Sequence, residues 1–164
     1  MNRRYTGAQY LEVIRKVRAK KPDIALGTDI IVGFCGETEA DFEDTVALYK
    51  AADFDISYTA MYSPRSGTVA KKFMTDDVPR AEKKRRWLAL QGLMEETVLR
   101  KNQGYLGRTV EVLVHAHDHG VASGNSREMK LVRCNSAEDV SGKAVRVRVT
   151  KAFEWMLSGE RVME

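Results

Sequence analysis

The sequence predicts an α/β segment at residues 1–105, followed by a small β-barrel at residues 106–164. Three features predict this fold class: a strand–helix–strand succession over residues 24–63, one long helical pattern from Pro79 to about Tyr105, and short strands of alternating polarity after Gly107. A chain of 164 residues has room for one medium domain or two small ones.

The first helix is predicted to begin after Thr6, because Thr6 can cap it and Gln9 stands three residues on. Tyr5 and Tyr10 occupy the positions of a hydrophobic staple. The expected apolar face of this helix consists of Tyr10, Val13, Ile14 and Val17. Pro22 ends the helix before an apolar run at 24–34, which predicts a strand covered on both faces.

A second helix is predicted after Thr38, with Asp41 at its third position and Phe42, Val46 and Tyr49 at core spacing. The next strand is expected at 56–63, in "ISYTAMYS". Strand, helix and strand of these lengths form a βαβ unit, so the two strands should be parallel. The long helix that follows opens with "RAEKKRRW" and has the packing stripe Trp87, Leu90, Met94 and Val98.

The strands of the barrel are predicted at 109–115, 129–133 and 143–153, with loops at 117–126 and 135–142. In "KAVRVRVTK" the two-residue period of a strand places alternate side chains on opposite faces. Val145, Val147 and Val149 should therefore face the barrel interior, while Arg146 and Arg148 face outward.

Two parallel strands alone would leave open edges and little core, so the first part of the chain is expected to be a piece of a larger sheet. The expected partner is a missing N-terminal half or a second copy of the chain. Either one would cover the exposed edge.

Composition excludes several classes of protein. No apolar window reaches the roughly 18 residues that a membrane span requires, and residues 1–10 do not have the apolar core of a signal peptide, so a cytoplasmic protein is expected. The only cysteines, Cys35 and Cys134, are too few for a zinc ribbon or a disulfide framework. The net charge is +4, and the basic excess lies in residues 78–107, with 7 basic against 3 acidic residues.

Three segments taken together carry a family resemblance: "TDIIVGF", "GETEADF" and "YSPRSGT". They resemble the C-terminal half of the radical S-adenosylmethionine barrel of the methylthiotransferases, and the β-rich tail is similar to their TRAM domain, an OB-like RNA-binding barrel. The resemblance implies a partial radical SAM (β/α) barrel followed by a small TRAM-type β-barrel. It favours the branch that adds a methylthio group to an N6-isopentenyl-type adenosine of tRNA, and a ribosomal-protein aspartate is the alternative substrate.

The resemblance also implies a set of site residues. Ile31, Val32, Gly33 and Phe34 would line the adenosine part of S-adenosylmethionine, and Tyr62, Ser63 and Arg65 would border cofactor or substrate. Glycines at a strand end allow close approach of a ligand, although Gly33 and Gly36 could serve only to make a tight turn. Members of the family use [4Fe-4S] clusters bound by a CxxxCxxC motif, and this chain has no such motif. The chain alone is therefore expected to be inactive, with no catalytic residues and no metal ligands of its own.

Two basic segments are candidates for RNA contact: Lys83, Lys84 and Arg85 in the long helix, and Arg146 and Arg148 in the last predicted strand. A solvated surface is the alternative in both places. Alternatives also remain for function, because the chain could be a stand-alone RNA-binding module or an assembly piece without catalysis.

Two further features have a structural and a chemical interpretation. His115, His117 and His119 could ligate a metal if the strand continued through them, but Asp118 and Gly120 favour a turn and therefore no metal site. Cys35 stands where the family usually has proline, and could be a reactive thiol or a small filler.

Overall fold

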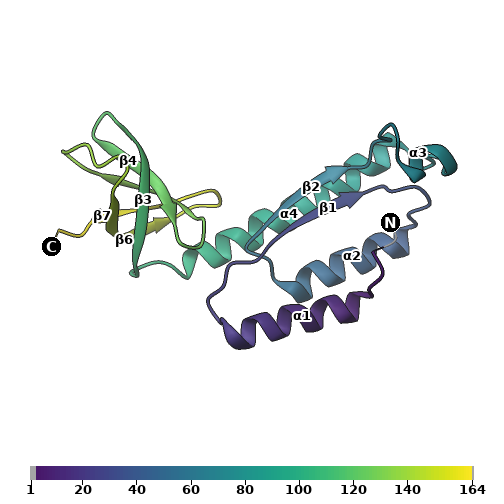
Figure 1. The fold of residues 1–164 in the computed structure, drawn as a ribbon, viewed down its shortest axis with the longest axis horizontal. Coiled ribbons are helices and arrows are strands. Elements are labelled where there is room, and N and C mark those ends of the chain that lie inside the picture. Colours follow the sequence, from purple (N-terminus) through teal and green to yellow (C-terminus); the bar gives the residue numbers. More distant parts are fainter. Residues whose placement is uncertain (1–2, 164) are drawn as a thin grey trace. The chain divides into compact units, whose positions relative to one another are not determined.

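The computed structural model describes residues 3–163, and the chain forms two compact units, one up to Met94 and one from Glu95 (Figure 1). The first unit contains α1 (Gly7–Lys20), β1 (Gly27–Val32), α2 (Glu39–Ala52), β2 (Ile56–Met61), α3 (Val69–Phe73) and the larger part of α4 (Arg80–Gln103). The second contains the end of α4 and the strands β3 (Thr109–Asp118), β4 (Val121–Ser126), β5 (Leu131–Asn135), β6 (Ala144–Ala152) and β7 (Leu157–Arg161).

The predicted N-caps of α1 and α2 are confirmed. Thr6 and Gln9 form a capping box, in which the Thr6 hydroxyl accepts from the Gln9 amide at 3.2 Å. The rings of Tyr5 and Tyr10 stack with their centroids 5.9 Å apart, as a staple requires. The apolar face of α1 is narrower than predicted, because the side chain of Val13 is 58% exposed.

The N-cap of α2 is also a capping box, with the carboxylate of Asp41 in place of the side-chain amide of Gln9. The Thr38 hydroxyl accepts from the Asp41 amide at 3.2 Å, and the Asp41 carboxylate accepts from the Thr38 amide at 2.9 Å. A negative side chain in the first turn also interacts favourably with the positive end of the helix dipole.

The strands β1 and β2 are parallel, as predicted, and pair from Gly27 with Ile56 to Val32 with Met61. The expectation that β1 is covered on both faces is wrong within this chain. One face packs on α2, where the Tyr49 hydroxyl lies 3.2 Å from the Ser57 hydroxyl, but the opposite face carries the exposed residues Asp29, Ile31, Tyr58 and Ala60. The reason is that α2 covers only the Ser57 face of a sheet that has two strands in the described residues.

The long helix α4 confirms the predicted packing stripe. Leu90, Met94 and Val98 are buried, and the indole N–H of Trp87 donates to the carbonyl of Thr59 in β2 at 2.8 Å. At its end the Asn102 amide donates to the carbonyl of Phe153 at 2.7 Å, which fixes the last turn of α4 to the barrel unit. Across residues 3–163, no helix combines the length and the apolar character that crossing a bilayer requires.

The second unit is a closed barrel with the strand order β3-β4-β5-β7-β6, in which only β5 and β7 are parallel neighbours. The predicted alternation along β6 is confirmed. Val145, Val147 and Val149 are buried in the barrel core, whereas Arg146 and Arg148 are exposed.

Two strands of the barrel lie where the sequence predicted no strand. Most of the expected loop at 117–126 is the end of β3 and the strand β4, and β7 lies beyond the last predicted strand. The inward positions of β4 hold Ala122 and Ser126, both nearly buried, with Gly124 between them. Small residues at these positions hide the hydrophobic alternation on which the prediction depended.

Glycines in β4 and β7 are paired with residues where the opposite strand bulges. Gly124 pairs with Val114, next to an irregularity in β3, and Gly159 pairs with Val149, next to one in β6. A Cβ atom at Gly124 would lie 2.2 Å from the Leu113 carbonyl oxygen, and one at Gly159 would lie 2.1 Å from that of Arg148. The backbones therefore approach too closely for any side chain, which is how bulges and glycines bend a sheet into a barrel.

We expect Gly124→Ala to lower the free energy of unfolding of the barrel by at least about 2 kcal/mol, because the new methyl group meets backbone that cannot rotate away. The matched control is Gly92→Ala in α4, where a Cβ atom meets nothing within 4 Å and helix propensity predicts a gain of about 1 kcal/mol. Amide hydrogen exchange of β3–β7 measures the first change. Equal protection of Gly124→Ala and the parent would contradict the role given to this glycine.

Candidate cofactor wall and RNA-facing surfaces

The carboxyl ends of β1 and β2 bring several of the predicted site residues together. The Tyr62 amide donates to the Val32 carbonyl at 2.8 Å, which continues the pairing one residue past β2. The rings of Phe34 and Tyr62 then meet edge to face, with their centroids 5.0 Å apart. Gly33, Phe34 and Tyr62 thus lie together at the end of the sheet, where they form one wall.

Gly33 serves a close approach as well as a turn. Its φ of +71° lies in the left-handed region, and a Cβ atom here would lie 2.3 Å from Cγ of Lys83. The glycine therefore leaves room for the aliphatic stem of a lysine from α4. Neither interpretation of the sequence included this contact with Lys83, and a ligand contact at Gly33 stays a prediction.

The backbone donors of this turn already have an acceptor in the chain. The Glu37 carboxylate accepts from the Gly33 amide at 2.9 Å and from the Phe34 amide at 3.4 Å. Arg86 of α4 donates to the same carboxylate at 2.7 Å and to the Glu37 carbonyl at 3.0 Å. A ligand at this wall would therefore meet apolar and aromatic side chains, because the two amides point at Glu37.

Glu37 and Arg86 were not among the predicted site residues. Their side chains are 14% and 5% exposed, so this ion pair is largely removed from water. The basic run "RAEKKRR" is typical of a helix surface, and its pairing with a carboxylate 49 positions earlier has no local signal. The spacing of Glu37, four residues after Gly33, is the one clue in the sequence.

A second carboxylate extends the network along α4. Glu82 accepts from Arg85 at 2.6 Å and from Arg86 at 2.8 Å. The pKa of Glu82 is lowered from its ordinary 4.5 to about 2, chiefly by the hydrogen bond from Arg85 and to a smaller extent by the one from Arg86. Because this pKa is lowered in the folded chain, the pairing contributes stability above pH 4.5, and that contribution is lost as the pH falls toward 2.

Lys83 is directed inward. Its side chain is 7% exposed, its ammonium group pairs with Asp76 and donates to the Tyr62 carbonyl at 3.3 Å, and it lies 5.2 Å from the Tyr62 ring centroid. The neighbouring Asp77 accepts from the Gly36 amide at 2.8 Å. The segment after α3 is thereby fixed to the turn after β1.

RNA contact by Lys83, Lys84 and Arg85 stays a prediction, and the structure gives the three residues different prospects. Lys83 is buried, so a phosphate could reach it only if its contacts with Asp76 and Tyr62 opened. Arg85 is half-exposed and pairs with Glu39 at 2.5 Å, whereas Lys84 is exposed.

The other predicted cofactor residues are not all at the surface. Ile31 is 37% exposed on the uncovered face of the sheet, and Ser63 and Arg65 lie in the loop after β2, where both are exposed. Val32 is 1% exposed and belongs to the core of the first unit. Cofactor binding by this set of residues stays a prediction.

Cys35 is buried beside the same wall. A hydrogen bond between its thiol and the Tyr62 hydroxyl raises the pKa of Tyr62, and burial raises it further. Cys134 lies in the barrel core, where burial raises the pKa of its thiol. Within residues 3–163 no three of the histidine, cysteine, aspartate and glutamate side chains gather where they could hold a metal ion.

The three histidines are separated by the local backbone. The pairing of β3 shifts at His115, His117 lies 2.9 Å from the Ser136 carbonyl through Nε2, and His119 has a φ of +46° in the turn before β4. The turn that Asp118 and Gly120 predicted is therefore present after β3, although the strand continues through His117.

The outward arginines of β6 stand among acidic residues. Arg146 is opposite Glu111 of β3, and Arg148 has Thr109 on one side and Glu160 of β7 on the other. This face of the barrel therefore carries basic and acidic side chains on neighbouring strands. RNA contact by Arg146 and Arg148 stays a prediction.

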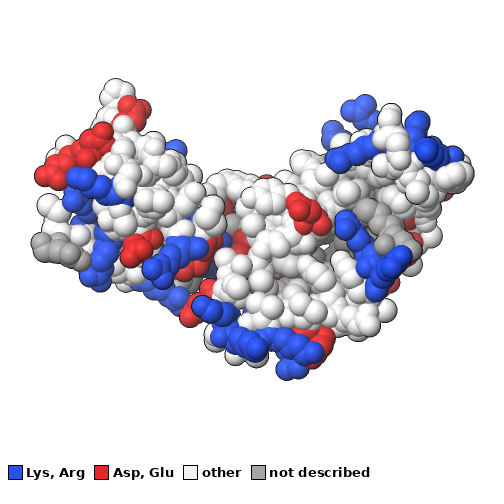
Figure 2. Space-filling model, in the orientation of Figure 1, with Lys and Arg blue, Asp and Glu red and all other residues white. Residues whose placement is uncertain are grey.

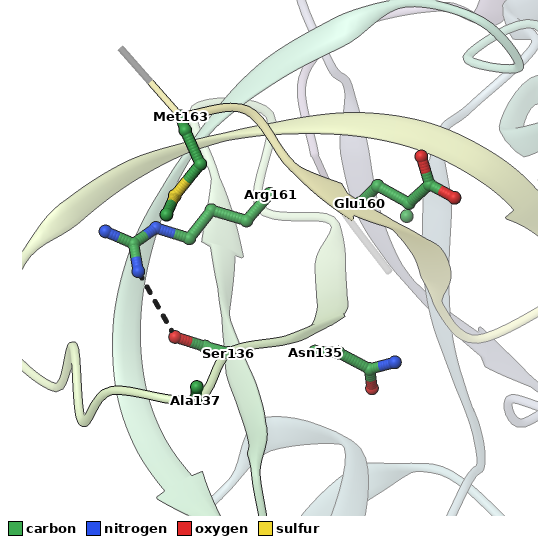
Figure 3. Close-up of a pocket in the computed structure, with 7 residues that line it drawn as sticks. Asn135, Ser136, Ala137, Glu160, Arg161 and Met163 are labelled. Atoms are coloured by element: carbon green, nitrogen blue, oxygen red, sulfur yellow. Dashed lines mark hydrogen bonds between the residues drawn. The ribbon is translucent and has the colours of Figure 1, made fainter.

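A pocket of about 230 Å³ lies at the ends of β5 and β7, and no predicted residue lines it. Arg161 reaches across it and donates to the Ser136 hydroxyl at 3.3 Å, with Met163 beside its side chain (Figure 3). Arg161 also lies 3.7 Å from Glu138, so its charge is partly neutralised within the barrel.

We expect Arg86→Met to destabilise the first unit by about 3 kcal/mol, because it leaves the Glu37 carboxylate largely buried without its cationic partner. Arg85→Met is the matched control on the adjacent, half-exposed arginine, and its effect should be small. Urea denaturation followed by the fluorescence of Trp87, corrected for the Trp155 signal of the barrel, measures both. Equal midpoints for the two variants would contradict the importance of the buried pair.

Several known proteins that are similar to this chain share one name. No family model matches the chain. The whole chain is 45% identical to tRNA-2-methylthio-N(6)-dimethylallyladenosine synthases of Geobacillus thermodenitrificans and Geobacillus kaustophilus, and covers 32% and 31% of their lengths. It is 42% identical, over 98% of its length, to the protein of that name from Clostridium novyi, of which it covers 36%. The chain spans about a third of these relatives and aligns with their C-terminal part, so it belongs to the tRNA methylthiotransferase family.

Proposed function

We propose that the chain supplies the C-terminal portion of a tRNA methylthiotransferase, which adds a methylthio group to an N6-isopentenyl-type adenosine beside the anticodon in the cytoplasm. The observation that carries this proposal is the identity of 42–45% along the chain to relatives named for that product. In this role residues 1–105 contribute part of the cofactor wall and residues 106–164 contribute RNA contact.

The exposed face and open edge of the sheet support the proposal that this unit is part of a larger barrel. Its uncovered face carries Ile31, 37% exposed, and Tyr58, 65% exposed, and β1 has β2 as its only strand partner in the described residues. Apolar side chains and open strand edges favour addition of further strands. We propose that a preceding N-terminal half, or a second copy of the chain, completes a radical SAM (β/α) barrel here.

The wall at the strand ends is suited to the adenosine of S-adenosylmethionine. Phe34 and Tyr62 offer aromatic edges and Ile31 an apolar side chain, while Glu37 and Arg86 hold the turn between them. S-adenosylmethionine bound at a [4Fe-4S] cluster supplies the radical chemistry of the family. This chain's own residues bind and orient the adenosine and keep the turn in one conformation.

The residues present do not fit an iron–sulfur cluster. Cys35 and Cys134 are both buried, and they lie in different compact units. A cluster needs several thiolates at one place, so its ligands must come from outside this chain.

Two features of the second unit support its assignment as a TRAM-type domain. It is a small closed barrel, and it carries Arg146 and Arg148 on its outer surface. Small barrels with a basic, solvent-facing strand commonly bind single-stranded nucleic acid. The acidic neighbours Glu111 and Glu160 would limit the net attraction, which favours contact with individual phosphates over a broad basic patch.

We expect the purified chain to bind no iron–sulfur cluster and to have no methylthiotransferase activity. The measurement is iron and sulfide content after anaerobic reconstitution, together with an assay of 2-methylthio product on tRNA. Stoichiometric iron and sulfide would contradict the assignment of the cluster ligands to another part of the protein.

We expect Arg146→Glu with Arg148→Glu to weaken tRNA binding and to lower the slope of log affinity against log salt by about 1 to 2. The fold should persist, because both side chains point away from the core. Lys20→Glu with Lys21→Glu at the end of α1 is a control with the same change of charge. A salt titration with circular dichroism as folding check measures the effect, and an unchanged slope in the barrel variant would assign these arginines to a solvated surface.

A further inference from the structure

The short helix α3 presents an aromatic side chain to solvent. Phe73 is 79% exposed, more than any other large apolar side chain in residues 3–163, and Val69 on the same helix is 71% exposed. Lys71 and Lys72 on the same helix and Arg65 in the loop before it are also exposed. We call Arg65, Lys71, Lys72 and Phe73 the α3 surface.

The backbone holds this surface in place. Thr68 caps α3 by accepting from the Lys71 amide at 3.3 Å, and its hydroxyl donates to the Arg65 carbonyl at 2.8 Å. After the helix, Asp76 pairs with Lys83 and Asp77 accepts from the Gly36 amide. Phe73 is thus exposed on an anchored segment, at low entropic cost for a ligand that contacts it.

The charges of the α3 surface have no counter-ions among the described residues. Arg65, Lys71 and Lys72 form no ion pair with any residue between 3 and 163, whereas Lys83, Arg85 and Arg86 of α4 all pair with carboxylates. Figure 2 shows basic side chains gathered at the upper right, where Figure 1 places α3. Positive charge available to a partner therefore lies on the same short helix as the exposed aromatic ring.

We propose that the α3 surface is an RNA contact, at which Phe73 stacks on an unpaired base and Lys71, Lys72 and Arg65 bind the adjoining phosphates. Aromatic rings flanked by cations are the usual platform for single-stranded nucleic acid, because every base has a stacking face and every phosphate a charge. A docking site for protein would bury the apolar ring without using three uncompensated cations. The inference rests on the proposed function, since a tRNA offers unpaired bases in its loops.

The test uses the whole chain and two probes, an oligoadenylate of about 12 nucleotides and an RNA duplex of about 12 base pairs. Phe73→Ala should lower affinity for the single strand about fivefold or more and leave affinity for the duplex unchanged, because only unpaired bases can stack on the ring. Phe73→Trp should keep the parent affinity. Phe73→Leu should weaken binding as much as Phe73→Ala, because leucine keeps an apolar side chain but cannot stack.

Two matched controls separate this surface from general effects. Tyr58→Ala removes another exposed aromatic ring, one that stands opposite Asp29 in the sheet and not among cations, and should leave affinity unchanged. Lys71→Gln with Lys72→Gln should lower the salt slope for the single strand by about 1.4, at roughly 0.7 for each phosphate that the variant no longer binds. Lys20→Gln with Lys21→Gln should change it by less than half of that.

Parent-like affinity in Phe73→Ala or in Phe73→Leu would overturn the inference. So would loss of self-association in Phe73→Ala without a change in RNA affinity, which would make α3 a protein-docking surface. In both cases the chain would still bind tRNA through its barrel, so the proposed function would stand. If the parent binds no RNA at all, the RNA contact of the proposed function fails together with this inference.

Discussion

The buried ion pair between Glu37 and Arg86 is the constraint on which the candidate site depends. One carboxylate accepts the amides of Gly33 and Phe34 and the guanidinium of Arg86, and it thereby joins the turn after β1 to α4. An ion pair removed from water is tolerated only when each partner is hydrogen-bonded, and breaking it leaves an uncompensated charge. The position of Phe34 at the wall follows from this arrangement, and the pairing of the Tyr62 amide with the Val32 carbonyl places Tyr62 beside it.

The same constraint changes how the charge of the chain is interpreted. The middle of the sequence has the basic excess, yet Lys83 and Arg86 are buried and neutralised by Asp76, Glu37 and Glu82. These cations stabilise the wall. The cations of α3, in a stretch of sequence that is acidic on balance, have no such partners in the described residues, so local charge density in the sequence was a poor guide to the charge that a ligand can meet.

Short-range chemistry made much of the fold predictable. The capping boxes at Thr6 and Thr38, the stripe of α4 and the alternation in β6 all depend on neighbours a few residues apart. The parallel pairing of β1 and β2 joins residues 29 positions apart, but the succession of strand, helix and strand predicted it. The strands β4 and β7 were missed because glycines replace inward apolar residues at the points of close approach. The exposed face of β1 and the burial of Lys83 and Arg86 depend on contacts across long separations, which a single sequence does not show.

Photochemical crosslinking of the chain to tRNA, read by mass spectrometry, is the sharpest test of the two RNA contacts, because it locates RNA on the protein without altering either beforehand. We expect crosslinked peptides from two places, the segment 65–73 with Phe73 and the outer face of β6. Few should come from the start of α4, where Lys83, Arg85 and Arg86 pair with carboxylates. Crosslinks concentrated on Lys83, Lys84 and Arg85, with none at α3 or β6, would contradict both contacts.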